Sequence, residues 1–133
     1  MRVARELGEV RRLNDATARY LLQGSASPAS IHDVQLVLEE LTTNVIRHAS
    51  PIDAPLSLEV EVELEPHSVR VQVEDDGDPF DPTTVREIPP PGGSAGLRAG
   101  GYGLRIVRHT AVDLRYRRLN DRNVLEMRVP LTS

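Results

Sequence analysis

The sequence predicts an α/β (α+β) two-layer sandwich, in which a mixed, largely antiparallel sheet carries about three helices on one face. Residues 56–64 and 69–74 alternate apolar and polar side chains and are joined by a short polar turn, which is typical of an antiparallel hairpin with one face in solvent. Residues 31–49 repeat apolar side chains at helical spacing. A sheet with one wet face needs helices on its other face only.

Length and composition limit the classes of protein. The chain has 133 residues, so we expect residues 1–133 to form a single domain with its own core. It has no cysteine, which excludes disulfides and thiolate zinc sites, and all sixteen basic residues are arginine, which excludes a lysine-based phosphate loop. A formal net charge of −4 argues against direct nucleic-acid binding. With no long apolar run and a charged start, we expect a cytoplasmic protein without membrane contact.

The first elements along the chain are two helices. Apolar side chains recur at helical spacing from Arg2 to Leu22, which predicts that the first helix begins almost at Met1. Residues 24–30 are rich in turn formers, and Pro28 or Ser30 is well placed to begin the second helix.

The second helix carries the first candidate site. Five residues gather into one apolar stripe, and Glu40 and Asn44 lie one turn apart along its margin. The stripe consists of Val34, Val37, Leu38, Leu41 and Val45. Taken alone, Glu40 and Asn44 are read most simply as solvated polar residues.

The second candidate site follows the hairpin, where the sequence reads Asp75-Asp76-Gly77-Asp78-Pro79. The spacing of these acidic residues lacks the full pattern of a calcium-binding loop. A buried carboxylate accepts a hydrogen bond from an amine, and Gly77, without a side chain, lets a planar base approach the backbone.

The third candidate site is a glycine-rich helix start. Residues 82–101 are rich in proline and glycine and lack periodicity, which is typical of a functional loop or a disordered segment. Gly100-Gly101-Tyr102-Gly103 then begins a helix, where free N–H groups suit anionic phosphates. Two more strands are expected at 112–118 and 124–129, around a turn at 120–123.

These three motifs, in this order, resemble the N, G1 and G2 boxes of the ATPase superfamily that includes gyrase, the heat-shock chaperone ATPase, mismatch-repair ATPases and histidine kinases. The resemblance covers about residues 29–129 and is strongest to the small anti-sigma-factor serine/threonine protein kinases. It implies the histidine-kinase-like ATPase fold, also called the Bergerat fold, with ATP and Mg²⁺ as cofactors.

The resemblance also implies a role for each site residue. Asn44 is similar to the Mg²⁺ ligand, Glu40 to the general base, and Asp75 to the acceptor of the adenine amino group. Residues 82–101 would form the ATP lid. The remaining assignments are a base pocket that includes Gly77 and Pro79, and triphosphate binding by Gly101, Gly103 and Arg98.

The implied biology is a partner switch, in which the kinase binds a sigma factor and phosphorylates an anti-anti-sigma (STAS-type) protein. A homodimer is possible but undecided. Members of this family commonly have a strand before the first helix, and dimerisation through that sheet edge is uncertain because we expect helix there.

Two alternatives remain. A regulatory module that binds ATP without catalysis would carry the same nucleotide-binding residues. An N-acetyltransferase is the remote alternative, because Arg98-Ala99-Gly100-Gly101-Tyr102-Gly103 also fits the Arg-x-x-Gly-x-Gly loop that wraps the pyrophosphate of coenzyme A.

Overall fold

The computed structural model describes residues 1–48, 55–84 and 101–133, and within these it does not describe the side chains of residues 48, 84 and 101–105. The predicted helices and strands are all present in the described residues, with one further strand at the start. Their order is β1 (Arg2–Val3), α1 (Leu7–Gln23), α2 (Pro28–His48), β2 (Leu58–Leu64), β3 (Ser68–Asp75), the 3₁₀ helix η1 (Pro82–Thr84), α4 (Gly101–Thr110), β4 (Val112–Leu119) and β5 (Arg122–Pro130).

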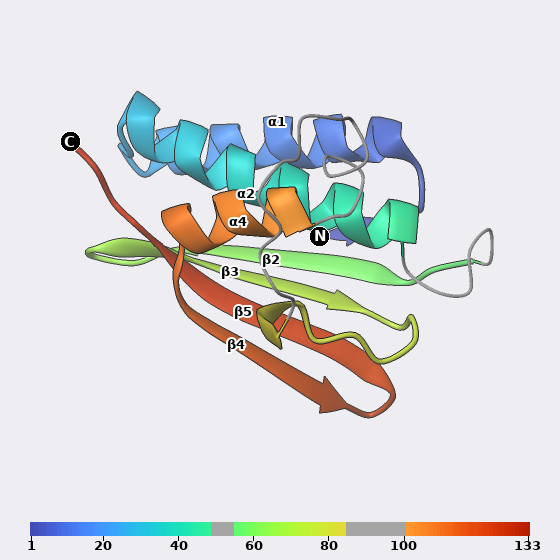
Figure 1. Cartoon of the computed structure of the whole chain (residues 1–133). Coiled ribbons are helices and arrows are strands. Elements are labelled where there is room, and N and C mark those ends of the chain that lie inside the picture. Colours follow the sequence, from blue (N-terminus) through green and yellow to red (C-terminus); the bar gives the residue numbers. More distant parts are fainter. Residues whose placement is uncertain (49–54, 85–100) are drawn as a thin grey trace, which may run out of the picture.

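The strands form one sheet in the order β1-β2-β3-β5-β4. Helices α1, α2 and α4 all cover the same face of this sheet, which confirms the predicted two-layer fold class (Figure 1). Every strand pairing in the described residues is antiparallel, whereas the sequence suggested a mixed sheet. The reason is that β5 lies between β3 and β4, so the crossover through α4 joins strands that are not neighbours.

The expectation that helix begins almost at Met1 is wrong. Arg2 and Val3 instead form β1, which pairs with Glu59 and Leu58 of β2. The amino group of Met1 also donates to the carbonyl of Val60. Val3 fits the helical apolar spacing by coincidence, since it is buried from a strand, with 1% of its surface exposed. The backbone groups of β2 need a partner at this edge, and β1 supplies it.

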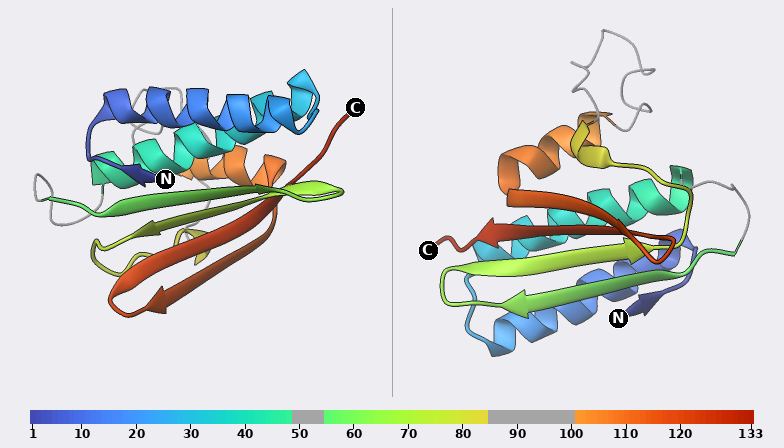
Figure 2. Two further views of the ribbon diagram at one scale, coloured as in Figure 1. Left: turned by 180° about the vertical axis from the view of Figure 1, so that it is seen from behind. Right: turned by 90° about the horizontal axis from the view of Figure 1, so that it is seen from below.

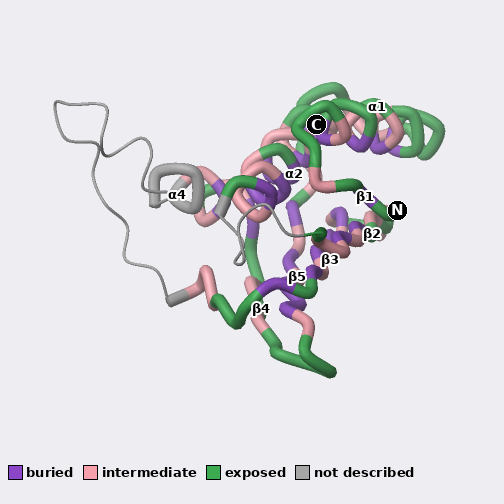
Figure 3. Tube along the Cα trace, turned by 90° about the vertical axis from the view of Figure 1, so that its right-hand side faces the viewer, coloured by how far each residue is buried: buried purple, intermediate pink, exposed green. Residues whose placement is uncertain are grey.

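The core lies between the sheet and the helices. The views in Figure 2 show that α1 lies over the β1–β2 side, α2 over the middle, and α4 next to β4. Buried residues line the inner faces of both layers (Figure 3). No helix in the described part of the chain is both long and apolar enough to cross a membrane. The largest buried side chains are Leu13, Leu21, Leu38, Leu58 and Met127, with a set of valines.

Both ends of α2 are held by specific hydrogen bonds. Ser27 caps the helix, because its Oγ accepts from the backbone N–H of Ser30 at 3.1 Å, and Pro28 occupies the first helical position. At the other end, Nε of Arg5 donates to the carbonyl of Ile46 at 3.1 Å. These contacts fix the axial position of the helix that carries Glu40 and Asn44.

The two residues of β1 give a matched test of this edge strand. Val3→Ala removes two methyl groups from the core and is expected to lower the free energy of unfolding by about 2 kcal/mol. Arg2→Ala removes an exposed ion pair with Glu59, in which 82% of the arginine side chain is exposed, and should cost less than about 0.5 kcal/mol. Urea unfolding followed by circular dichroism measures both changes. Equal effects of the two substitutions would contradict the assignment of β1.

Candidate functional site

Glu40 and Asn44 lie on α2 as predicted, at the margin of its apolar stripe. Val34, Val37, Leu38 and Leu41 are buried, whereas Val45 is partly buried. Glu40 and Asn44 are both half-buried. The helix therefore carries a carboxylate and an amide, one turn apart, at the boundary between core and solvent.

The electrostatic environment of Glu40 differs from that of an ordinary surface carboxylate. Burial raises the pKa of Glu40, the negative charge of Glu39 raises it further, and the positive charge of Arg47 acts in the opposite direction. A carboxylate with a raised pKa is a stronger base, so it is better matched to accepting a proton near neutral pH.

Asp75 is the last residue of β3 and is buried, with 7% of its surface exposed. Its Oδ1 accepts two hydrogen bonds, from the backbone N–H of Gly77 at 2.9 Å and from Nδ2 of Asn123 at 3.0 Å. Within the described part of the chain, no donor reaches Oδ2 of Asp75. This oxygen is therefore an acceptor that can take a hydrogen bond from an amine.

The backbone after Asp75 is anchored on both sides. Asp76 pairs with Ser57 in both directions, since the N–H of Ser57 donates to Oδ1 of Asp76 at 2.8 Å and the N–H of Asp76 donates to the Ser57 carbonyl at 3.2 Å. On the other side, Nη1 of Arg118 donates to the carbonyl of Gly77 at 2.7 Å. Pro79 is exposed, as is Phe80, of which 51% is exposed. A rigid turn thus leads to an exposed proline and an aromatic ring.

Asn123 was expected in a turn at residues 120–123 and was not among the predicted site residues. The turn consists instead of Asn120 and Asp121, both with positive φ, as a two-residue hairpin of the I′ type requires. Asn123 belongs to β5 and lies opposite Asp75 in the β3–β5 register. Reading Asn120 and Asp121 as a two-residue turn would have placed Asn123 on the strand.

The glycine motif begins a helix where it was expected. Helix α4 starts at Gly101 and includes Gly103. Arg98 and most of residues 82–101 lie outside the described residues. The start of that segment forms η1, where Asp81 Oδ1 accepts from the N–H and the hydroxyl of Thr83. Nη2 of Arg108 on α4 donates to the carbonyls of Pro82 and Thr83, both at 3.1 Å, so α4 and η1 are joined.

The fold brings the three motifs to one region. The C-terminal ends of α2 and β3 lie at one end of the molecule in Figures 1 and 2, and α4, the helix that begins with the glycine motif, packs beside α2.

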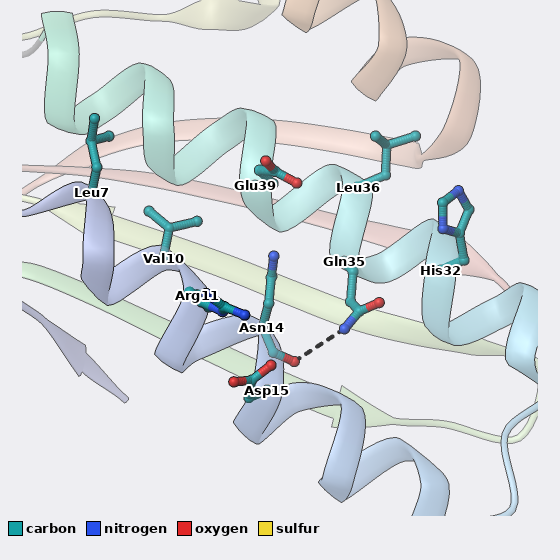
Figure 4. A pocket seen from close by; sticks show the side chains of 9 residues that line it. All are labelled: Leu7, Val10, Arg11, Asn14, Asp15, His32, Gln35, Leu36 and Glu39. Atoms are coloured by element: carbon teal, nitrogen blue, oxygen red, sulfur yellow. Dashed lines mark hydrogen bonds between the residues drawn. The ribbon is translucent and has the colours of Figure 1, made fainter.

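A separate groove of about 470 Å³ lies between α1 and α2 (Figure 4). Glu39 lines it, but Glu40, Asn44 and Asp75 do not. Its polar lining mixes a cation, carboxylates and amides, so it favours no single ligand charge. The lining residues are Leu7, Val10, Arg11, Asn14, Asp15, His32, Gln35, Leu36 and Glu39.

Comparison with known proteins identifies the family of the chain. The family described as the histidine kinase-like ATPase domain matches residues 3–129. The chain belongs to the histidine-kinase-like ATPase family. The family description implies that the domain binds ATP.

Individual relatives of this ATPase domain are distant. The serine/threonine-protein kinase BtrW of Bordetella bronchiseptica is 27% identical over 92 residues, which cover 69% of this chain and 65% of that protein. Two structures of the blue-light-activated histidine kinase EL346 of Erythrobacter litoralis, one of its histidine kinase domain, each superpose with a TM-score of 0.53. Their identities are 22% and 24%, and the matches cover 77% and 80% of this chain but only 45% and 32% of those chains. These structures confirm the fold.

The raised pKa of Glu40 predicts a stability change in Glu40→Gln. The folded protein binds the Glu40 proton more tightly than the unfolded protein does. The free energy of unfolding therefore falls as pH rises from the ordinary glutamate pKa of 4.5 to the raised pKa, and it stays at the lower value at higher pH. Glu40→Gln should therefore melt at a higher temperature than wild type at pH 8, with no such difference at pH 4. Calorimetric melting at both pH values tests this. A lower melting temperature for the variant at pH 8 would contradict it.

Proposed function

We propose that this ATPase domain is an ATP-dependent serine/threonine protein kinase of the anti-sigma-factor type. The observation that carries the proposal is Glu40, a half-buried carboxylate with a raised pKa, one helical turn before the amide of Asn44. The match to a serine/threonine-protein kinase over 69% of the chain supports it.

Glu40 is the general base in this proposal. It would accept the hydroxyl proton of a serine on the partner protein as that hydroxyl oxygen bonded to the γ-phosphorus of bound ATP, with ADP as the leaving group. Because burial raises the pKa of Glu40, proton transfer to it is more favourable than to an exposed glutamate. Glu40 remains at the solvent boundary, which leaves room for the partner's side chain.

The residues present suit Mg–ATP. When bound, this cofactor supplies the phosphoryl group and the positive charge that stabilises it during transfer. Asn44 offers a neutral oxygen, an appropriate ligand for Mg²⁺ beside phosphate oxygens. Asp75 Oδ2 would accept from the adenine amino group, and the backbone N–H groups at the N-terminal end of α4, at Gly101 and Gly103, would hold the phosphates.

The partners in this proposal are a sigma factor and an anti-anti-sigma protein of the STAS type. This part rests on the resemblance of the three motifs to anti-sigma-factor kinases. A module that binds ATP without phosphoryl transfer is the second candidate. The N-acetyltransferase alternative receives no support from the family match, which makes acetyl-CoA a useful control.

Titration calorimetry tests the nucleotide site. Wild type should bind ATP in the presence of Mg²⁺, and should not bind acetyl-CoA. Asp75→Asn should weaken ATP binding at least about tenfold, because the amide places a donor against the adenine amine. Asn44→Ala should remove the gain in affinity that Mg²⁺ provides. Absence of ATP binding in wild type would overturn the proposed function.

Phosphotransfer tests Glu40. With radiolabelled ATP and a purified STAS-domain protein as acceptor, Glu40→Gln should lower the transfer rate by about 100-fold or more, while ATP affinity stays within a few-fold. Asp33→Asn, on the same helix two turns earlier, is the matched control and should transfer at the wild-type rate. Undiminished transfer by Glu40→Gln would exclude Glu40 as the base, and wild type that binds ATP without transfer would favour the second candidate.

A further inference from the structure

Asn123 is the most highly connected side chain near the predicted base pocket. It is buried, with 7% of its surface exposed, and is paired with Asp75 on the neighbouring strand β3. Nδ2 of Asn123 donates to Oδ1 of Asp75 at 3.0 Å and to the carbonyl of Asp78 at 2.9 Å, with a longer contact of 3.4 Å to the carbonyl of Gly77. Its oxygen accepts from the N–H of Phe80 at 3.2 Å and from the hydroxyl of Tyr116 at 2.6 Å.

This network allows only one orientation of the Asn123 amide. A carboxylate and backbone carbonyls lie on one side of it, and these accept hydrogen bonds only. The N–H of Phe80 lies on the other side and can only donate. If the amide were turned over, its oxygen would face the carboxylate and the carbonyls, and its N–H groups would face the N–H of Phe80. Tyr116, on β4, adds a second donor that holds the oxygen in place.

The fixed amide determines how Asp75 is presented. Asn123 and the N–H of Gly77 both donate to Oδ1, so they fix the plane of the carboxylate and leave Oδ2 as its available acceptor. The same amide holds the backbone of Asp78 and Phe80. Asn123 therefore sets both the direction of the carboxylate and the position of the loop beside it.

We propose that Asn123 is the positioning residue that determines which nucleobase this site accepts. This inference rests on the proposed function and extends it. Asp75 held with Oδ2 available pairs with the amino group of adenine, whereas hypoxanthine and guanine present a carbonyl oxygen at the same ring position. Two acceptors cannot pair, so a carboxylate that cannot turn away rejects the carbonyl. A carboxylate that is free to turn would discriminate less.

Calorimetry with Mg–ATP and Mg–ITP tests the proposal, because the two nucleotides differ in the base at this position. Wild type should favour ATP by at least about 100-fold. Asn123→Ala should weaken ATP binding by about 10- to 100-fold and ITP binding by less than about threefold, so that the ratio of the two affinities narrows. Tyr116→Phe removes one hydroxyl and should lower the ratio of ATP affinity to ITP affinity by a smaller factor than Asn123→Ala does. Asn120→Gly, in the turn of the same hairpin at a positive φ that glycine adopts freely, should keep the wild-type ratio.

A purely structural role gives a different result. Loosening of the hairpin would weaken ATP and ITP equally and leave their ratio unchanged in both Asn123→Ala and Tyr116→Phe, which would overturn the proposal. Because Tyr116→Phe deletes a single oxygen atom, it supplies the answer if Asn123→Ala does not fold.

The pH dependence of Asn123→Asp provides an independent readout. The substitution places a second carboxyl group beside Asp75, and the pair should share one proton because two close negative charges repel. The protonated group then donates to its neighbour as the amide did. ATP affinity of this variant should rise about tenfold or more from pH 8 to pH 5.5, against a change of less than about threefold in wild type. A pH profile equal to that of wild type would overturn the proposal.

Nucleotide binding by wild type distinguishes an error in the proposed ATP site from an error in the role of Asn123. If wild type binds neither nucleotide, the proposed ATP site itself is wrong. If wild type binds ATP and the Asn123 and Tyr116 variants keep the wild-type ratio, the nucleotide site stands and the role assigned to Asn123 is wrong.

Discussion

The antiparallel register between β3 and β5 is the constraint on which the rest of the structure depends. It pairs Val69, Val71 and Val73 with Val129, Met127 and Leu125, all of which are buried. It also sets Asp75 opposite Asn123. A shift of the register by one residue would turn one strand's apolar side chains toward the open face and separate these two polar residues. Hydrophobic burial along the strands thus fixes the polar contact at their end.

Helix α2 holds two of the predicted site residues in a fixed position on this sheet. Its apolar stripe packs on the sheet, so the margin of the stripe, where Glu40 and Asn44 lie, is fixed relative to β3 and β5. Partial burial raises the pKa of Glu40, which costs stability when the group is ionised. The same desolvation makes Glu40 a better base. A residue that opposes stability in this way is common at functional sites.

The fold alone does not decide which acceptor receives a phosphoryl group. The two histidine kinase structures share the fold seen here, whereas the relative found by sequence is named as a serine/threonine kinase. At identities of 22–27%, the likeness supports a common framework. Function depends on the site and not on the fold. The parts of the site whose chemistry can be tested are Glu40, Asn44, Asp75 and the first residues of α4.

Periodicity predicted the helices, the two hairpins and the one-sided sheet, because amphipathic elements reveal their buried faces through spacings of 3.6 and 2 residues. The motifs around Glu40, Asp75 and Gly101 were also visible, since each depends on residues close together in the sequence. Strand order, the pairing of Arg2 and Val3 with β2, and the contact of Asn123 with Asp75 were decided only by the tertiary structure. Asn123 and Asp75 are 48 positions apart, and no local pattern encodes which strands become neighbours. The sequence alone therefore determined the elements and the residue types available for chemistry, while long-range packing decided which side chains meet.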